Sequence, residues 1–167
     1  MGERRGDRKV RSDKKVDVKP TVSDRTKRQL YKFSELCELS VKDVSEQLIR
    51  NACTSPLILD DIHQWFRRDY FCPPAIHKGY LERPRLKILF NEETGKINTR
   101  FPQQPYDQLC QLAYSLDLPP TTTAAILIKR TLHNREFMFE YVRSLKHLSN
   151  EQKNEIHAFL RKIWGFR

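Results

Sequence analysis

The chain has 167 residues, which is enough for one ordinary domain or two very small ones. Its 31 lysine and arginine residues outnumber its 21 aspartate and glutamate residues, and the formal net charge of +10 favours a polyanionic partner, with nucleic acid first and an anionic membrane surface second. The amino-terminal segment is too polar for a signal peptide, and no run approaches the roughly 18 apolar residues that a membrane span requires. These features predict a cytoplasmic protein that binds nucleic acid and does not enter a membrane.

Basic side chains are concentrated at the amino terminus. Residues 1–14 contain almost nothing to bury, so we expect them to form a disordered basic arm. Such an arm either contacts a polyanion or only keeps the protein in solution.

A strand and two helices are predicted over residues 15–53. Apolar and polar residues alternate along Val16–Val22, as in a strand with one buried face. Pro20 restricts this strand to an edge or an end of a sheet. Ser23 and Ser40 are good N-cap residues, and each stands directly before an apolar helical pattern.

Residues 54–90 are predicted to contain a helix and a connector. The helix is expected over 54–71, because Pro56 stands in its first turn and apolar residues follow at helical spacing. The segment CPPAIHKGYLERP is rich in turn-forming residues. RLKILF (85–90) has the composition of a strand, and the turn residues NEETGK after it allow a hairpin with INTRF.

The order strand, helix, helix recurs in residues 91–133. Polar and apolar side chains alternate over Lys96–Phe101, and two apolar helical runs split by a pair of prolines follow. Residues 134–167 are predicted to form a helical extension with helices over Glu136–Leu148 and Asn150–Trp164, the second opened by a capping-box pattern. We expect the aromatic residues of this extension to be core; the alternatives are self-association or docking of a protein partner.

Two such strands could pair antiparallel as a ribbon supported by four helices, since a single strand leaves its backbone groups unpaired. A two-stranded ribbon fits the major groove of B-DNA, where asparagine pairs with adenine and arginine or lysine with guanine. Alternation places one set of polar side chains on the outward face of each strand. The predicted base-reading residues are Lys96, Asn98, Arg100, Lys19 and Thr21.

The stretch INTRFP, followed by YDQLCQLAYSLDLP and PTTTAAILIKRTL, resembles the ribbon-helix-helix family of DNA-binding proteins, the Arc, MetJ and CopG class. The resemblance implies a mainly α fold with a short antiparallel β-ribbon, here as tandem ribbon-helix-helix units with added C-terminal helices. It also implies that the start of each second helix anchors a DNA phosphate. The residues at these positions are Thr121, Thr122, Thr123, Ser40 and Lys42. The first unit departs from the family pattern at Asp17 and at Pro20.

Two pairings of the strands are compatible with the sequence. We favour pairing of Val16–Val22 with Lys96–Phe101 inside one chain, which gives an intramolecular pseudo-dimer. In the alternative, 85–90 pairs with the second strand as a hairpin, and the first strand pairs with its copy in another chain.

Catalytic, metal and cofactor sites are not expected. His63, Cys72 and His77 fit no common zinc-ligand spacing, and the acidic pair Asp60 and Asp61 suits the first turns of a helix without any catalytic role. The four cysteines are widely spaced and lack a CxxC motif, so no disulfide is expected.

The leading hypothesis is a non-enzymatic protein that binds a specific double-stranded DNA sequence. Relatives in the family that the chain resembles repress transcription, control plasmid copy number, act as antitoxins or assist conjugative DNA processing. The resemblance therefore favours a transcriptional regulator or an accessory factor of a plasmid or other mobile element. The alternative is a helical protein-interaction module whose basic charge contacts nucleic acid without sequence preference.

Overall fold

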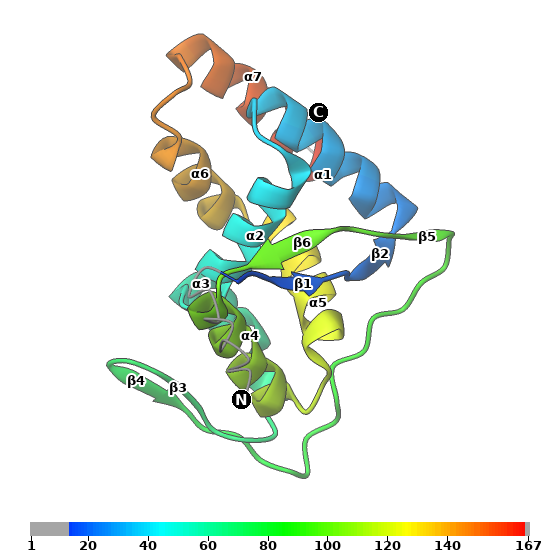
Figure 1. Ribbon diagram of the computed structural model, residues 1–167, viewed down its shortest axis with the longest axis vertical. Helices are drawn as coiled ribbons and strands as arrows, with labels where there is room; N and C mark the ends of the chain where they lie inside the picture. Colours follow the sequence, from blue (N-terminus) through cyan, green and yellow to red (C-terminus); the bar gives the residue numbers. More distant parts are fainter. Residues whose placement is uncertain (1–13, 166–167) are drawn as a thin grey trace, which may run out of the picture.

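The computed structural model describes residues 14–165 and is mainly helical, with short antiparallel strand pairs (Figure 1). In chain order, its elements are β1 (Val16–Val18), β2 (Thr21–Ser23), α1 (Asp24–Leu36), α2 (Val41–Ala52), α3 (Pro56–Ile62), the 3-10 turn η1 (His63–Trp65), β3 (Tyr70–Cys72), β4 (Ala75–His77), β5 (Thr94–Lys96), β6 (Thr99–Phe101), α4 (Gln103–Leu116), α5 (Pro120–Leu132), α6 (Arg135–Ser144) and α7 (Asn150–Ile163). Most of the predicted basic arm lies outside the described residues.

A two-stranded ribbon forms within the chain, in one continuous antiparallel register. In β1 and β6, Val16 lies opposite Phe101, and in β2 and β5, Thr21 lies opposite Lys96. The ladder is interrupted at Pro20 because proline has no N–H, although its carbonyl accepts a hydrogen bond of 2.9 Å from the Ile97 N–H. The predicted pairing within one chain is therefore confirmed.

The alternative hairpin is wrong. Residues 84–93, which we call the strap, form neither a helix nor a strand, and they run in extended form to the start of β5. The strap is held by burial of Leu86 and by packing of Ile88 against the core, and the Glu93 carbonyl accepts a hydrogen bond from the Asp24 N–H. These contacts hold the strap against the helices, while the β1 and β2 segments occupy the pairing edge of β5 and β6.

Side chains alternate across the ribbon as predicted. The inward residues of the second strand, Ile97, Thr99 and Phe101, are at most 1% exposed. Thr99 tolerates burial because its hydroxyl donates to the Val18 carbonyl at 2.7 Å. The inward side chains of Val18 and Val22 are buried too, so the ribbon contributes one whole face to the core.

Side-chain caps define the starts of several helices. The Ser23 hydroxyl accepts from the Thr26 N–H at 3.2 Å and begins α1, while Ser40 accepts from the Asp43 N–H at 3.1 Å and begins α2. Ser149 and Gln152 form the predicted capping box at α7. Local sequence therefore determines where these helices start.

The elements of the chain repeat at a constant spacing, and the repeat includes three helices in each copy. Helices α1 and α4 begin at residues 24 and 103, α2 and α5 at 41 and 120, and α3 and α6 at 56 and 135, a separation of 79 residues in each case. Glu38 and Asp117, also 79 residues apart, both adopt positive φ angles, 56° and 58°, in the turn after the first helix. The identical buried residues at related positions are Leu30 and Leu109, Leu48 and Leu127, and Ile49 and Ile128.

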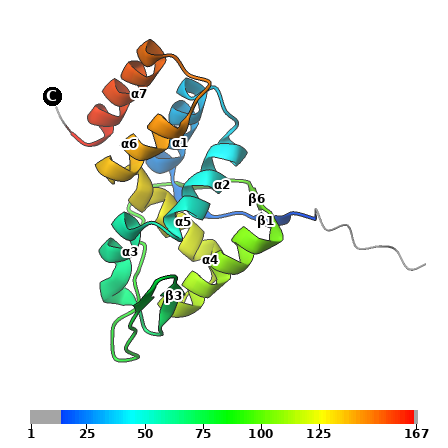
Figure 2. The same ribbon diagram turned by 90° about the vertical axis from the view of Figure 1, so that its left-hand side faces the viewer.

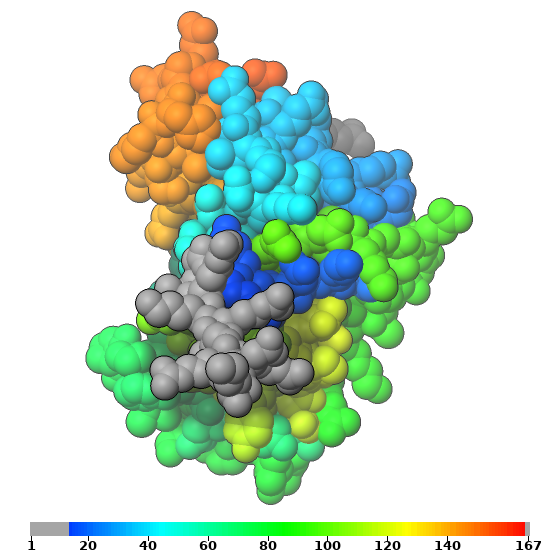
Figure 3. Space-filling model, viewed as in Figure 1, coloured from blue at the N-terminus to red at the C-terminus, as the bar shows by residue number. Residues whose placement is uncertain are grey.

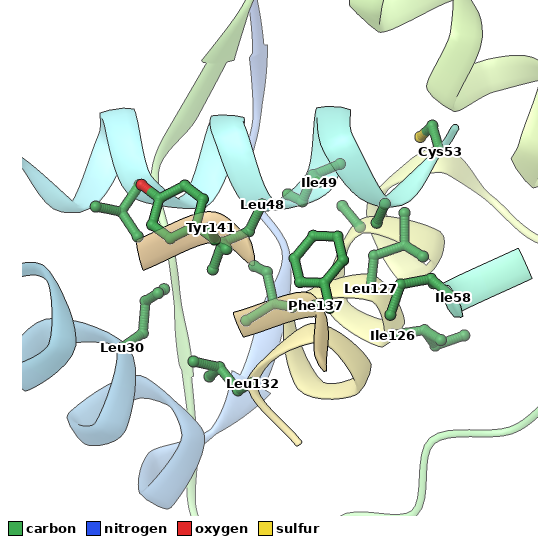
Figure 4. Close-up of a cluster of buried hydrophobic side chains, with 14 of the residues drawn as sticks. Leu30, Leu48, Ile49, Cys53, Ile58, Ile126, Leu127, Leu132, Phe137 and Tyr141 are labelled. Atoms are coloured by element: carbon green, nitrogen blue, oxygen red, sulfur yellow. The ribbon is translucent and has the colours of Figure 1, made fainter. Parts of the chain in front are cut away.

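The two copies are interleaved. Helix α2 packs against α5 and against β6, while α5 packs against β1 and β2, so each second helix lies under the strand of the other copy. Figure 4 shows the resulting cluster, in which side chains from α1, α2, α3, α5 and α6 fill one space.

Burial raises the pKa of the Cys37 and Cys53 thiols to about 12, which keeps both protonated at neutral pH. The four cysteines are free thiols.

Two predicted helices are shorter than expected. Helix α3 ends at Ile62 because the N–H groups of Arg67 and Arg68 are drawn to the Ser115 carbonyl of α4, at 2.8 and 3.1 Å. The β3–β4 hairpin begins at Tyr70, inside the predicted helix, and extends into the predicted connector. Helix α6 ends at Ser144, where the chain turns so that His147 Nε2 lies 2.8 Å from the Cys37 carbonyl oxygen.

The added elements lie at the two ends of the molecule. Helix α7 lies at one end of the long axis, next to α1 and α6, and the β3–β4 hairpin lies at the other end, next to α4 (Figures 1 and 2). The ribbon lies between these ends and is open to solvent on its outward face. Within residues 14–165, every helix is too short or too polar to cross a membrane.

Candidate nucleic-acid interface

The outward face of the ribbon is a polar surface that crosses the middle of the molecule. In Figure 3, β1 and β6 form a band of surface between α2 on one side and α5 on the other. The predicted base-reading residues Lys19, Lys96, Asn98 and Arg100 are all exposed on this face, while Thr21 is half-buried. The structure thus brings the five predicted base-reading side chains into one surface.

The register organises these side chains into cross-strand pairs. Continuity between the two ladders places Lys19 opposite Asn98 at the centre of the ribbon. Asp17 and Arg100 form the pair on one side of the centre, and Thr21 and Lys96 form the pair on the other. A shift of 79 residues along the sequence relates Asp17 to Lys96 and Thr21 to Arg100. The two outer pairs therefore occupy related positions, although their side chains differ.

Arg100 is tied to an acidic neighbour. Its Nε donates to Asp17 Oδ1 at 2.7 Å, and both side chains are a little over half exposed. This hydrogen bond holds the pKa of Asp17 below its usual range, and the charges of Lys19 and Lys42 act in the same direction. Asp17, which the sequence placed on the outward face as a departure from the family pattern, therefore orients a base-reading candidate and compensates its charge.

The start of α5 lies next to the ribbon. Thr121 and Thr122 line a pocket of about 380 Å³ together with Thr21 of β2. Pro120 has no N–H, and the first turn of a helix leaves its amides without intrahelical partners, so the free donors here are the amides of Thr121 and Thr122. This end of the helix has the geometry of an anion contact beside the reading surface.

Thr123 does not fit the predicted phosphate role. Its side chain is fully buried, its hydroxyl donates to the Pro119 carbonyl at 3.0 Å, and its N–H donates to the same carbonyl. Thr123 is the first residue of α5 whose N–H bonds back to the Pro119 carbonyl, and at this position its side chain faces the core. The predicted phosphate role of Thr123 is therefore wrong. Thr121 and Thr122 remain the candidate phosphate contacts of α5.

The start of α2 occupies the related position at the other side of the ribbon. Lys42 is exposed, and its charge contributes to the low pKa of Asp17. The Ser40 hydroxyl is engaged in capping the Asp43 N–H, and the Asp43 carboxylate lies in the first turn. An acidic group there weakens the attraction of a helix start for phosphate, so the positive charge at this end comes from Lys42.

Lys27 is a further cation at the ribbon that sequence reasoning missed. The methylene and ammonium groups of Lys27 lie above Gly95 of β5, and a Cβ added at that glycine would approach Lys27 Cδ to 2.9 Å. A glycine inside a strand often indicates that another group approaches the backbone closely. Gly95 was therefore the sequence feature that could have indicated a neighbour such as Lys27.

The other candidate clusters are part of the packing. The rings of His63 and His77 lie 5.6 Å apart and each contacts the ring of Phe66. Asp61 forms an ion pair with Arg130 at 2.8 Å. Within the part of the chain that the structure describes, no group of three or more His, Cys, Asp or Glu side chains could hold a metal ion.

The geometry of the ribbon therefore provides the basis for a functional assignment. Its exposed face presents amide, ammonium and guanidinium groups, and helix starts lie at both of its sides. Comparisons with protein-family models, curated proteins and solved structures find no match to the chain.

Proposed function

We propose that the protein binds a specific double-stranded DNA sequence as a tandem ribbon-helix-helix protein, with the ribbon in the major groove. The observation that carries the proposal is the outward face of the ribbon, where Lys19, Asn98 and Lys96 are exposed while the opposite face is part of the core. A two-stranded ribbon has the width of the major groove, and these side chain types match base edges there.

Candidate phosphate contacts on both sides of the ribbon support the same docking. Thr121 and Thr122 would donate their amides to one backbone, and Lys42 would approach the other. Lys27 extends the positive surface at the end of the ribbon. The net charge of +10 would add non-specific attraction that falls with salt.

The DNA site is expected to lack a palindrome. Symmetry of an operator mirrors symmetry of the protein, and the two outer pairs of the ribbon, Asp17 with Arg100 and Thr21 with Lys96, differ chemically. A single chain would then bind one asymmetric site. Control of transcription, or an accessory role in DNA processing on a plasmid or mobile element, is the biological context that we infer from the family resemblance.

Selection of bound duplexes from a randomised library tests the proposal. We expect enrichment of one asymmetric sequence that spans roughly one helical turn of DNA. Asn98→Ala and Arg100→Ala should each weaken binding to that sequence by about 1–3 kcal/mol while changing binding to random DNA less. Lys146→Ala is the matched control, because Lys146 is an exposed lysine in the connection between α6 and α7, far from the ribbon.

Two outcomes would contradict the proposal. Uniform weak recovery of all sequences would favour the helical interaction module with non-specific nucleic-acid affinity. Normal binding to the selected site by both ribbon variants, with unchanged thermal unfolding, would show that the ribbon does not contact the bases.

A further inference from the structure

A second pocket lies behind one end of the ribbon, on its helical side. It has a volume of about 520 Å³, in the range of pockets that hold small molecules. Its walls are the first turns of α1, the last turn of α5, the end of α7 and the strap. These segments come from four separate parts of the chain, so the pocket forms only when the chain is folded.

Positive charge dominates the lining of this pocket. Arg25, Lys129 and Lys162 line it and make no ion pair within residues 14–165, whereas Arg130, next to Lys129, is paired with Asp61. The single acidic side chain among the lining residues is Glu92. Unpaired cations around a hollow attract an anion, and they are stabilised when one binds.

His133 lines the same pocket as Arg25 and Lys129. Loss of hydration around its ring lowers the pKa of His133, and the nearby charges of Lys129 and Arg25 lower it further. A neutral imidazole at physiological pH can donate one hydrogen bond to an anion without adding a charge. An anion bound here would also raise the pKa of His133, since it would offset the two neighbouring cations.

The rest of the lining combines polar side chains, among them Ser23, Thr26 and Asn91, with apolar ones. Val22, Ala125 and Ile163 present apolar surface, and Leu89 of the strap closes one side. Leu89 is 84% exposed, so its side chain is accessible to an apolar group in the pocket. The side-chain oxygen of Gln29, which also lines the pocket, is buried and has no hydrogen-bond partner in the described part of the chain.

We propose that this pocket binds a small amphipathic anion, a carboxylate, phosphate or sulfonate on an apolar body, with its charge between Arg25, Lys129 and Lys162 and its body against Val22 and Leu89. A donor group on the ligand would satisfy the Gln29 oxygen. Because Thr21, Val22 and Ser23 form part of the wall, the bound ligand would also contact the β2 strand of the ribbon. The site adjoins the proposed DNA surface, because Thr21 lines the pocket and also belongs to the outward face of the ribbon, whereas Val22 points inward.

Titration of the full-length protein with octanoate, without DNA, tests the site. We expect saturable binding of one molecule per chain, with 1-octanol, which has the same apolar body and no charge, binding at least tenfold more weakly. Lys129→Met should weaken octanoate binding about tenfold, as expected for one charge-assisted hydrogen bond. Lys146→Met, at a distant exposed lysine, is the matched control and should bind like the wild type.

The imidazole signal of His133, followed by NMR as a function of pH, gives a second readout. Its pKa should rise when octanoate is bound and should stay unchanged with 1-octanol. Equal binding of octanoate and octanol, equal binding by Lys129→Met, or an unmoved His133 pKa would each overturn the proposal. Thermal unfolding of each variant establishes that it is folded.

A DNA duplex distinguishes this proposal from the proposed function. If octanoate and DNA bind together, the pocket is a site of its own, whatever sequence the DNA has. If DNA displaces octanoate in strict proportion to its concentration, the cations of the pocket are phosphate contacts and the small-ligand proposal is wrong. Failure to select any specific DNA sequence would leave the octanoate result unaffected.

Discussion

Asp17 and Arg100 face each other across the outward surface of the ribbon, joined by a hydrogen bond of 2.7 Å between Asp17 Oδ1 and Arg100 Nε. The pair at the related position, Thr21 and Lys96, has no acidic member. One side of the ribbon therefore carries an arginine whose charge is compensated, and the other carries Lys96, which makes no ion pair among residues 14–165. A DNA phosphate or base at the first side meets both members of an ion pair.

Asp17→Asn removes the acidic member of this pair while retaining its size. We expect affinity for random DNA to rise and the dependence of log affinity on log salt to steepen by about one unit, because one more cation becomes available to phosphate. Preference for the selected base at the Arg100 position should fall, since Arg100 loses its orienting partner. Fluorescence anisotropy at several salt concentrations measures both quantities.

Glu151→Gln is the control for this experiment, because it removes an exposed acid on α7, away from the ribbon. If both variants change the salt dependence equally, the effect is one of net charge, and the Asp17–Arg100 pair has no special role.

Asp117→Asn should reduce stability in a manner that depends on pH. Asp117 receives hydrogen bonds from Arg85, Arg67 and Arg68, and the Arg85 hydrogen bond is the main reason why the pKa of Asp117 lies below its usual range. A carboxyl with a lowered pKa stabilises the fold at neutral pH, and this contribution is lost as the pH falls below the ordinary range of aspartate and through the lowered value. The unfolding free energy of the variant should therefore fall less steeply with acid.

Glu38→Gln provides the matched control for Asp117→Asn. Glu38 occupies the related turn with nearly the same positive φ, but it makes no ion pair among the described residues. Chemical denaturation from neutral to acidic pH measures both variants. An equal loss in both would mean that the turn conformation, and not the arginine cluster, determines the effect.

Gly79→Ala should destabilise the fold by about 1–3 kcal/mol, the usual range for forced overpacking. A Cβ at this position would lie 2.3 Å from backbone atoms of Arg68, which cannot move as a side chain can. Gly95→Ala is the comparison, because the added Cβ would meet the flexible end of Lys27 at 2.9 Å and should cost little. Similar unfolding midpoints for the two variants would contradict the close approach at Gly79.

Glu46→Gln should stabilise the protein at neutral pH. Glu46 is 9% exposed, and its Oε1 has no hydrogen-bond partner in the described residues, although Oε2 lies 3.3 Å from Arg50. Burial raises the pKa of Glu46, so the folded state disfavours the carboxylate. The cost of the charge appears as the pH rises through the raised pKa, and it is absent at low pH where the wild type is protonated.

Denaturation across the acidic and neutral range measures this effect. The gain of the glutamine variant over the wild type should be present at neutral pH and should vanish in acid. A gain that is constant with pH, or a loss at neutral pH, would show that the Arg50 ion pair outweighs the cost of burial.

Local chemistry made much of the fold predictable. Ser23, Ser40 and Ser149 have side chains that cap helix starts, and period-two alternation identifies both strands of the ribbon, whose pairing within the chain was predicted correctly. The ends of α3 and α6 were not predictable, since they depend on contacts with distant elements, such as the Ser115 carbonyl. Glu38 and Asp117 adopt positive φ angles without the glycine that usually signals them, so neither turn could be recognised from its sequence.

The candidate site divides in the same way. Alternation alone places Lys96, Asn98 and Arg100 on one exposed face. The burial of Thr123 follows from the interleaved packing of α5, which sequence spacing does not contain. The pocket of Arg25 and Lys129 lay beyond prediction altogether, because its walls meet only after the strap has crossed the helices.

The interleaved copies also determine how the ribbon responds to dilution. When two separate chains supply the strands of a ribbon, the ribbon comes apart below the dissociation constant of the pair. Here a covalent connection of 70 residues between Ser23 and Thr94 supplies the second strand at a fixed effective concentration. The folded ribbon is therefore independent of protein abundance, and either half can accept a substitution that the other half does not receive, as Asp17 and Lys96 already illustrate at related positions.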